Sequence, residues 1–488
     1  MNIRNGMRLP KGAKLRVGKL LLVGLLLFAA AFTGSAGMVV FAAPSSGAAP
    51  AGEAPAPESV LLLYDSLAKG TADERTLPVV ERLLSAFGSS VTPVSLDRYK
   101  SGMLEEYPRT ILLRNRPDLA PSEEVLAELN QYAGKRFALF GSAAASRTGE
   151  GSAADPLATW AESRVSQLPT GADGTLKLAN ALREWFGVKK EGDVYLLIKE
   201  AYPFSDLDLL EEFADRLGEA GIPFLLATRP VFSNTEYPAM LRYLESLKYV
   251  QSRGGSILVQ TPVVKLAATR ADTTLRSKMD GFLDTLMNGG IVPLGVVSEA
   301  YWTYDREFAE GGLSFFDSAA LLPDVNPVYM ERLPSSKAFA SSLYTFSPEE
   351  LPLSELSQAN LPTFPVDTAL AYDLPETREE MEELLRQLKA SWLDYSDYKN
   401  EAHTVRTERR IASSADGILT LDGQPVSIDY VPRQVSADFE YATKDPVSFA
   451  RLFRAQNRFF LVIIVAALIA FVALIGIGRR LYRRKFLK

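Results

Sequence analysis

The chain has 488 residues, of which 47% are hydrophobic and 23% are charged, and it carries a formal net charge of −6. This length is enough for two or three domains, and the composition is that of a globular protein with apolar segments added. The chain contains no cysteine and one histidine. This excludes a disulfide framework, thiol chemistry and a Cys/His zinc site assembled from a single chain.

The first 43 residues have the pattern of a signal peptide or a signal anchor. Residues 1–19 carry six basic side chains and no acidic one, and an apolar run follows at 20–43. The run is long enough to span a bilayer, yet the small residues near its end suit cleavage, so cleavage and retention both stay open. Residues 44–58, rich in Pro, Ala and Gly, predict a linker.

A first α/β domain is predicted for residues 59–145. Four short apolar runs there have the composition of strands, and helical patterns lie near 75–87 and 121–133. This region resembles a flavodoxin-like or glutamine-amidotransferase-like α/β layer, although an amidotransferase would need the nucleophilic cysteine that the chain lacks. Residues 146–189, which begin rich in Ala, Ser and Gly, are interpreted as a flexible connection, with an ordered lid as the alternative.

Residues 190–400 contain strand-then-helix units at nearly even spacing. Apolar runs typical of strands lie at 193–198, 222–227, 256–260 and 291–297, and helical stripes separate them. Strands that alternate with helices of this length favour parallel pairing with right-handed crossovers. The sequence therefore predicts an α/β layer or barrel.

Four segments of this region resemble the polysaccharide-deacetylase-like (NodB-homology) superfamily, and in particular an uncharacterised, membrane-anchored bacterial branch. They are 198–206 (IKEAYPFSD), 221–232 (GIPFLLATRPVF), 255–262 (GSILVQTP) and 293–297 (PLGVV). The resemblance rests on their order and spacing. It implies a distorted (β/α) barrel whose strand ends hold a divalent metal.

The positions that should hold the metal are altered in this chain. Lys199 and Glu200 stand where the family places two acids, and the run from Gln260 to Val264 stands where it places a histidine motif. A lysine ammonium group beside a cation site disfavours metal binding further. The resemblance therefore implies a degenerate barrel that holds no metal and no other cofactor.

Three carboxylates near the expected strand ends, Glu200, Asp206 and Glu299, are the candidates for acid–base catalysis if any catalysis remains. Two carboxyl groups can act as acid and base when their environments push their pKa values apart. In a chain with 59 acidic residues their presence near a rim is weak evidence. The non-catalytic interpretation is favoured, and enzymatic activity stays open.

Aromatic residues follow the fourth strand, at Tyr301, Trp302 and Tyr304. Rings at such a rim can stack on sugars, and the alternative is ordinary packing in the core or in a loop. Residues 401–457 predict a small β element and a juxtamembrane segment, because Asp-Gly pairs at 416–417 and 422–423 mark hairpin turns. His403 is interpreted as a surface or packed residue and not as a ligand.

The end of the chain predicts a transmembrane helix at 458–478. Residues 459–477 include no polar side chain, and six basic residues follow in the tail at 479–488. Basic residues at both ends of the chain place both ends in the cytoplasm and the region between them outside it. Residues 44–450 hold 38 Lys and Arg against 59 Asp and Glu, a net charge of −21, which argues against nucleic acid or polyanionic glycan as a partner.

These patterns together predict an extracytoplasmic protein of the cell membrane with a degenerate deacetylase-like domain. We expect it to bind carbohydrate, or to act as a scaffold, in cell-envelope or exopolysaccharide assembly. Its expected partners are the membrane and envelope polysaccharides or envelope-assembly proteins. The alternative is an active carbohydrate deacetylase or hydrolase with an atypical carboxylate site.

Overall fold

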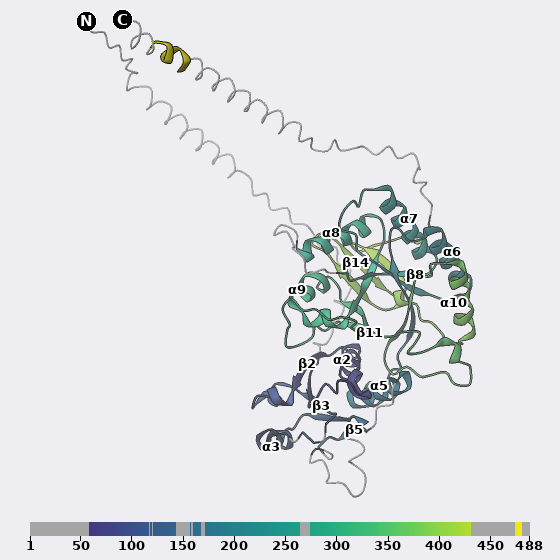
Figure 1. Cartoon of the computed structure of the whole chain (residues 1–488). Coiled ribbons are helices and arrows are strands. Elements are labelled where there is room, and N and C mark those ends of the chain that lie inside the picture. Colours follow the sequence, from purple (N-terminus) through teal and green to yellow (C-terminus); the bar gives the residue numbers. More distant parts are fainter. Residues whose placement is uncertain are drawn as a thin grey trace, which may run out of the picture. The chain divides into compact units, whose positions relative to one another are not determined.

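The structure, a computed structural model (Figure 1), describes residues 58–142 except 117 and 120, residues 157, 160–166, 171–263, 274–430 and 474–480. The predicted signal segment at 1–43, nearly all of the linker at 44–58 and the candidate position Val264 lie outside these residues. By its contacts the chain divides into residues 1–55 and residues 56–488. All the described residues belong to the second of these units.

Five strands among the described residues 58–166 form a parallel sheet in the order β2-β1-β3-β4-β5. Three α-helices, α2, α3 and α5, accompany it. The bounds are β1 Ser59–Tyr64, α2 Thr76–Ala86, β2 Ser90–Ser95, β3 Arg109–Arg114, α3 Glu123–Gln131, β4 Lys135–Phe140, β5 Ser163–Ser166 and α5 Ala172–Phe186. Flavodoxin-like doubly wound sheets have the same strand order.

Strand alternation gives this sheet two separate apolar faces. Val60 and Leu62 of β1 point into a core that includes the apolar stripes of α2 and α5, whereas Leu61 and Leu63 pack with α3 and Trp160 on the other face. Both faces are buried, as expected for a parallel sheet covered by helices. The prediction of a flexible connection at 146–189 is therefore wrong for β5 and α5, because Ala-rich helices with Leu at regular spacing bury a face as well as any other helix.

Seven further strands of the described chain close into a parallel barrel in the order β10-β11-β12-β6-β7-β8-β9. The strands are β6 Val194–Ala201, β7 Phe224–Thr228, β8 Gly255–Gln260, β9 Pro293–Glu299, β10 Ser318–Leu322, β11 Ser341–Phe346 and β12 Thr368–Asp373. Helices α6 Leu207–Glu219, α7 Pro238–Ser252, α8 Leu275–Asn288 and α10 Arg378–Ala390 lie around it (Figure 1). The prediction of a (β/α) barrel is thus confirmed.

Among the described residues the barrel has no α-helix of its own over β11, and the first sheet's helix α2 packs there instead. Arg82 of α2 is only 3% exposed; its guanidinium group donates to the carbonyl oxygen of Thr345 at 3.1 Å and to the hydroxyl of Tyr344 at 2.8 Å. It also lies 4.4 Å from the centroid of the Tyr344 ring. The boundary predicted between 59–145 and 190–400 therefore does not separate two cores.

The loop at 323–340, between β10 and β11, pairs with the edge of β2. The amide of Ser336 donates to the carbonyl oxygen of Val91 at 2.9 Å, and the amide of Val91 donates to the Ser336 hydroxyl at 2.9 Å. These bonds cover a strand edge that would otherwise be open to pairing with another chain. They also fix a loop that forms part of the barrel mouth.

A four-stranded antiparallel sheet follows the barrel, within the region 401–457 for which a small β element was predicted. Its strands are β13 His403–Arg406, β14 Ile411–Ala415, β15 Ile418–Leu421 and β16 Gln424–Pro425. The Asp-Gly turns have positive φ at both residues, with Asp416 at 51° and Gly417 at 79°, as type I′ hairpins require. The first strand of this sheet, β13, lies beside the start of β10, because the amide of Asp317 donates to the carbonyl oxygen of Thr404 at 3.1 Å.

Among the residues that the structure describes, no helix is both long and apolar enough to cross a membrane. Most of the segment predicted to do so, residues 458–473, lies outside the described residues. Its last residues, 474–478, are helical. The transmembrane helix stays a prediction.

His403 is a packed residue at the amino-terminal end of the barrel. It is 1% exposed, its ring stacks on Tyr398 at 3.7 Å, and its Nε2 donates to the carbonyl oxygen of Tyr398 at 2.9 Å. Its Nδ1 then accepts from the hydroxyl of Ser318 at 2.8 Å, which fits the neutral ring. This agrees with the interpretation of His403 as a packed residue and not a ligand.

Burial lowers the pKa of His403 from 6.5 to about 4, although the hydrogen bond to Tyr398 acts in the opposite direction. Between these pKa values the unfolded chain binds the proton and the folded chain does not. The contribution of His403 to stability is therefore complete above pH 6.5 and falls as the pH drops towards 4, by roughly 3 kcal/mol in all.

We predict that His403→Gln flattens the dependence of the unfolding free energy on pH between 4 and 6.5. Urea unfolding of the wild-type chain and of the variant across this range gives the unfolding free energy of each, and the difference between them reports on His403. The comparison is needed because burial raises the pKa of Glu81 to about 7, which gives both chains an additional pH dependence of opposite sign. The imidazole protons of the one histidine in the chain provide a direct check by NMR. A titration of His403 near pH 6.5 in the folded protein would contradict the prediction.

Candidate active site

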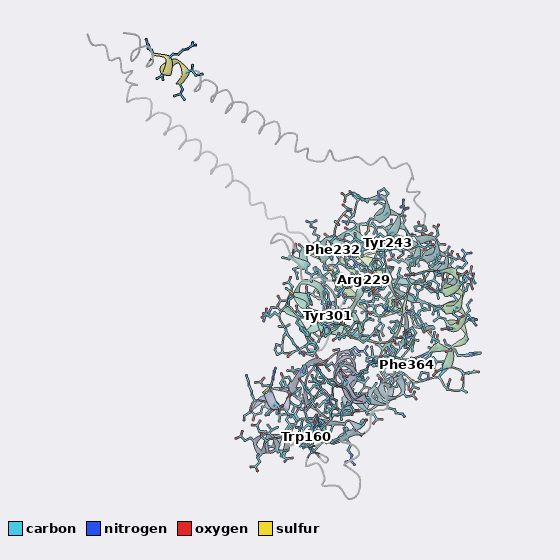
Figure 2. The ribbon with its side chains drawn as sticks, viewed as in Figure 1. Trp160, Arg229, Phe232, Tyr243, Tyr301 and Phe364 are labelled. Carbon is cyan, nitrogen blue, oxygen red and sulfur yellow. The ribbon has the colours of Figure 1, made fainter. Side chains whose placement is uncertain are left out.

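A cavity of about 510 Å³ lies at the carboxyl ends of the barrel strands. Its polar lining comes from the ends of β6, β7, β8, β9 and β11 and from the segments that follow β10 and β11. These side chains are Lys199, Glu200, Arg229, Gln260, Thr261, Glu299, Asn326, Thr345 and Ser347. Aromatic and aliphatic side chains complete the walls, and Figure 2 labels Arg229 and Tyr301 among the lining residues. Cavities of this size and mixed lining are typical of small-ligand sites.

A local irregularity of β6 directs Glu200 into this cavity. Ile198 pairs with Leu226 of β7 and Ala201 pairs with Thr228, so two residues of β6 stand opposite one residue of β7. Glu200, one of these two, has φ of 67°, a conformation that costs free energy for a residue with a side chain. A bulge of this kind turns side chains away from the alternation of the strand.

The Glu200 carboxylate forms a bidentate ion pair with Arg229, which follows β7. The Nε of Arg229 donates to Oε2 of Glu200 at 3.0 Å and the Nη2 donates to Oε1. The Nη1 of Arg229 donates to the carbonyl oxygen of Thr261. With two parallel bonds and mostly buried partners, this is the geometry in which an Arg–carboxylate pair is strongest.

Two further side chains complete the environment of Glu200. Gln260 donates from Nε2 to Oε1 of Glu200 at 2.9 Å, and the Gln260 Oε1 accepts from the amide of Glu200 at 3.0 Å. The hydroxyl of Tyr202 donates to Oε2 at 2.5 Å. Each carboxylate oxygen therefore accepts two hydrogen bonds, so neither is left with a free position for a metal or a substrate proton.

This environment keeps Glu200 ionised. Burial alone would raise the pKa of its carboxyl group, but the guanidinium group of Arg229 and the hydrogen bonds from Tyr202 and Gln260 outweigh burial and lower the pKa below its usual value. A carboxylate of low pKa is a poor general acid at neutral pH, and one whose lone pairs are all occupied is a poor general base. The candidate role of Glu200 in acid–base catalysis is therefore not supported by its contacts.

The donor set at the strand ends does not fit a divalent metal. Lys199 forms an ion pair with Asp373 of β12, Glu200 is taken by Arg229, and Gln260 is bonded to Glu200. Within the described residues no group of three or more His, Asp or Glu side chains is placed to hold a metal ion. Catalytic zinc sites use three protein ligands.

Glu299, at the end of β9, is the candidate carboxylate with a different environment. Burial and the charge of Asp324 raise its pKa, whereas Arg229 and a backbone hydrogen bond from Val325 act in the opposite direction. Asp324 lies close by, with its Oδ1 accepting from the amide of Tyr301 at 2.8 Å. Glu299 thus lines the cavity as a carboxyl group that holds its proton to a higher pH than an exposed glutamate does.

Asp206 lies outside this cavity. Its carboxylate caps α6 by accepting from the amide of Leu209 at 3.0 Å, which accounts for its position at the start of that helix. It lines a neighbouring groove together with Glu200. The structure therefore brings Glu200 and Glu299 to one cavity and gives Asp206 a structural role.

The three aromatic residues after β9 are mainly packed. Trp302 is 1% exposed and stacks on Phe308 at 4.5 Å, and Tyr304 is 3% exposed and is not among the residues that line the cavity. Tyr301 is also buried, with an edge of its ring against Tyr329. Their placement favours the packing alternative, in which these rings support the cavity wall.

Sequence reasoning did not single out Arg229, the cation that pairs with Glu200. A signal was present, because Arg229 directly follows the second strand pattern and the carboxyl ends of parallel strands meet at one end of a barrel. It also missed Asp373, the partner of Lys199, which lies at the end of a strand far along the chain. Neither partner is visible in a local motif.

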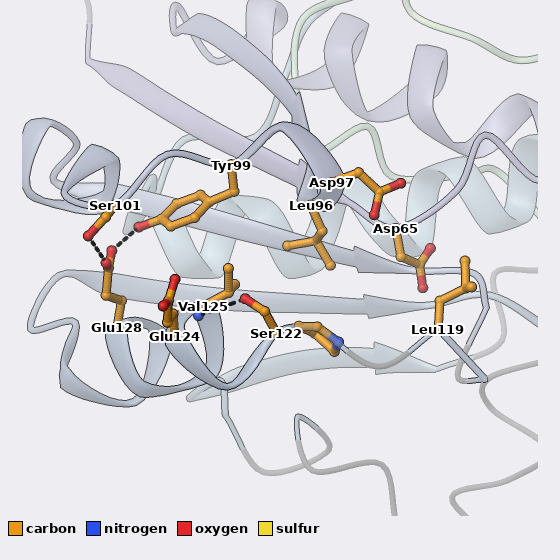
Figure 3. Close-up of a pocket in the computed structure, with 11 residues that line it drawn as sticks. Asp65, Leu96, Asp97, Tyr99, Ser101, Leu119, Ser122, Glu124, Val125 and Glu128 are labelled. Atoms are coloured by element: carbon orange, nitrogen blue, oxygen red, sulfur yellow. Dashed lines mark hydrogen bonds between the residues drawn. The ribbon is translucent and has the colours of Figure 1, made fainter.

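A smaller cavity of about 250 Å³ lies at the carboxyl ends of β1, β2 and β3 in the first sheet. Figure 3 shows the hydroxyls of Tyr99 and Ser101 pointing at the carboxylate of Glu128, and the buried Asp65 accepts from the amides of Asn115 and Arg116 at 2.9 Å each. Flavodoxin-like sheets bind ligands at this position. Here the lining carboxylates repel the phosphate of a nucleotide or flavin.

No family model matches the chain. A stretch of the chain is 38% identical over 94 residues to the uncharacterised protein YdaL of Bacillus subtilis (strain 168). The match covers 17% of this chain and 16% of that protein. The similarity concerns a short segment of both proteins.

We predict that Arg229→Met destabilises the full chain by about 1.5–3 kcal/mol at pH 7, because it leaves a buried carboxylate without its charged partner. Since the ion pair lowers the pKa of Glu200 from 4.5, its contribution is present above pH 4.5 and fades as the pH falls through the lower, folded-state value. The loss should therefore be smaller at pH 4. Urea unfolding measures both losses.

The control for this prediction is Arg216→Met, which removes an exposed ion pair with Glu382 between α6 and α10 and should cost much less. Adding Glu200→Gln to Arg229→Met should recover part of the stability, because the uncompensated charge disappears. Equal losses for Arg229→Met and Arg216→Met, or no recovery in the double variant, would show that Glu200 does not depend on Arg229.

Proposed function

We propose that this chain is a membrane-anchored, extracytoplasmic protein with a degenerate polysaccharide-deacetylase-like barrel, which binds carbohydrate of the cell envelope or of an exopolysaccharide. The observation that carries the proposal is the strand-end cavity in which Glu200 is held by Arg229, Gln260 and Tyr202. When the carboxylate is engaged in an internal ion pair, the cavity remains polar and can still accommodate a ligand. It then lacks the metal ligand that metal-assisted hydrolysis needs.

The lining of the cavity supports a ligand with many hydroxyl groups and no acid. Asn326 and Ser347 offer hydrogen-bonding groups, and the exposed side chains of Val325 and Val328 offer apolar surface for the C–H face of a sugar ring. The charges of Glu200 and Arg229 cancel, whereas Glu299 is a cavity carboxyl group that forms no ion pair with the other described residues. An anionic sugar in the cavity would place its charge beside this carboxyl group, which disfavours its binding.

The alternative function is an active carbohydrate deacetylase or hydrolase, and one observation favours it. The raised pKa of Glu299 is a property that a general acid needs. Asp324 is the nearby carboxyl group that would complete a pair. This alternative requires catalysis without the three metal ligands of a zinc hydrolase, so we rank it second.

We predict that the full chain binds neutral chito-oligosaccharides in isothermal titration calorimetry and does not bind oligogalacturonates of equal length. Asn326→Ala, which removes a hydrogen-bonding side chain from the cavity, should weaken binding roughly 2–10-fold. Asn360→Ala is the matched control, because Asn360 is also exposed but lies outside the cavity. The proposal fails if no neutral glycan binds.

The same samples test the alternative. Incubation with the oligosaccharides should release neither acetate nor new reducing ends. Release of either product that disappears in Glu299→Gln would establish the hydrolase alternative in place of the binding function.

A further inference from the structure

A groove of about 940 Å³ adjoins the cavity at the mouth of the barrel. It runs between the turn that connects β6 to α6 and the segment that connects β12 to α10. The groove and the cavity share Lys199 and Glu200 among their lining residues. The ion pair between Lys199 and Asp373 thus lies where the two hollows meet.

The groove carries an aromatic ring in an unusual position. Phe204 is 82% exposed, and its ring stacks on that of Tyr202 with centroids 4.9 Å apart and planes at 19°. An exposed phenylalanine gains little from burial, so its position is not explained by the core. One of its faces is covered by Tyr202, and this contact orients the ring.

The turn that holds Phe204 is built from several contacts. The amide of Ser205 donates to the carbonyl oxygen of Tyr202 at 3.1 Å, and the amide of Tyr202 donates to the hydroxyl of Ser205 at 3.1 Å. The hydroxyl of Tyr202 reaches the Glu200 carboxylate, which belongs to both hollows. The aromatic pair is therefore tied to the ion pair of the cavity and presented in a fixed orientation.

The charge of the groove restricts what can occupy it. Its lining includes Asp373, Glu376, Glu380 and Glu383, whereas Lys199 is its one cation among the lining residues and is paired with Asp373. An acidic surface repels uronic acids, phosphates and nucleic acids. Carboxylates and an exposed ring side by side are suited to a neutral sugar, whose hydroxyls donate hydrogen bonds while its C–H face lies on the ring.

We propose that this groove is a second carbohydrate subsite, so that the ligand is a neutral glycan chain that runs from the cavity across the Lys199–Asp373 ion pair onto Phe204. The inference rests on the proposed function, since it extends the ligand of the same site. It assigns Phe204 as the residue that makes affinity depend on the length of the chain.

The test is a series of neutral chito-oligosaccharides, from the monosaccharide to the hexasaccharide, titrated into the full chain and into Phe204→Ala. For the wild-type chain, affinity should rise with length. For Phe204→Ala, affinity for the hexasaccharide should fall roughly 3–10-fold, while affinity for the shortest ligand that binds should be unchanged. Phe204→Trp should keep the dependence on length.

The matched control is Phe232→Ala, because Phe232 is also a partly exposed phenylalanine after a barrel strand but lines neither hollow. It should bind every ligand as the wild-type chain does. If the wild-type chain binds the hexasaccharide and Phe204→Ala binds it equally well, or loses affinity for all lengths equally, the second subsite is refuted and the proposed function stands. If the wild-type chain binds no member of the series, the proposed function itself fails.

Discussion

The ion pair between Glu200 and Arg229 is the interaction on which the mouth of the barrel depends. A carboxylate at the strand ends of a closed barrel lies in a region of low dielectric, where it needs a positive partner. Arg229 supplies that charge as a guanidinium group with two parallel hydrogen bonds, and Gln260 and Tyr202 satisfy the remaining lone pairs. The strained backbone of Glu200 persists because these contacts hold it.

The first sheet also contributes contacts that support the barrel. The described barrel lacks an α-helix of its own over β11, and α2 covers that strand while Arg82 bonds to Thr345 and Tyr344. Thr345 also lines the cavity. The loop at 323–340 lines the cavity with residues of its first part, such as Asn326, and pairs with β2 further along, at Ser336. The geometry of the cavity therefore depends on residues from both the first sheet and the barrel.

Much of this fold could be predicted from local patterns. Apolar runs separated by amphipathic helices predicted β6 to β9, four of the seven described barrel strands, and the Asp-Gly pairs predicted the hairpins of the last sheet. The connection at 146–189 was misjudged because Ala, Ser and Gly are common both in linkers and in well-packed helices such as α5. The composition of a segment does not reveal whether a partner face exists to bury it.

The site was predictable only in part. Lys199, Glu200 and Gln260 were identified through the resemblance to the deacetylase-like superfamily, as positions where its motifs are altered, and the structure brings them together. Arg229, Asp373 and Phe204 were not, because their roles depend on which strand ends become neighbours and on which side chains stay exposed. A bulge such as the one at Lys199–Glu200 decides where a side chain points, and it leaves no clear mark in a single sequence.

A guanidinium group, and not a metal ion, neutralises the carboxylate at the strand ends. Equilibrium dialysis of the full chain against micromolar zinc, with the bound metal measured by atomic absorption, tests it most directly. We expect no stoichiometric zinc in the wild-type chain, because no lone pair of Glu200 is free and the neighbouring positions are lysine and glutamine. One zinc ion per chain that is lost in Glu200→Gln would contradict this account of the site.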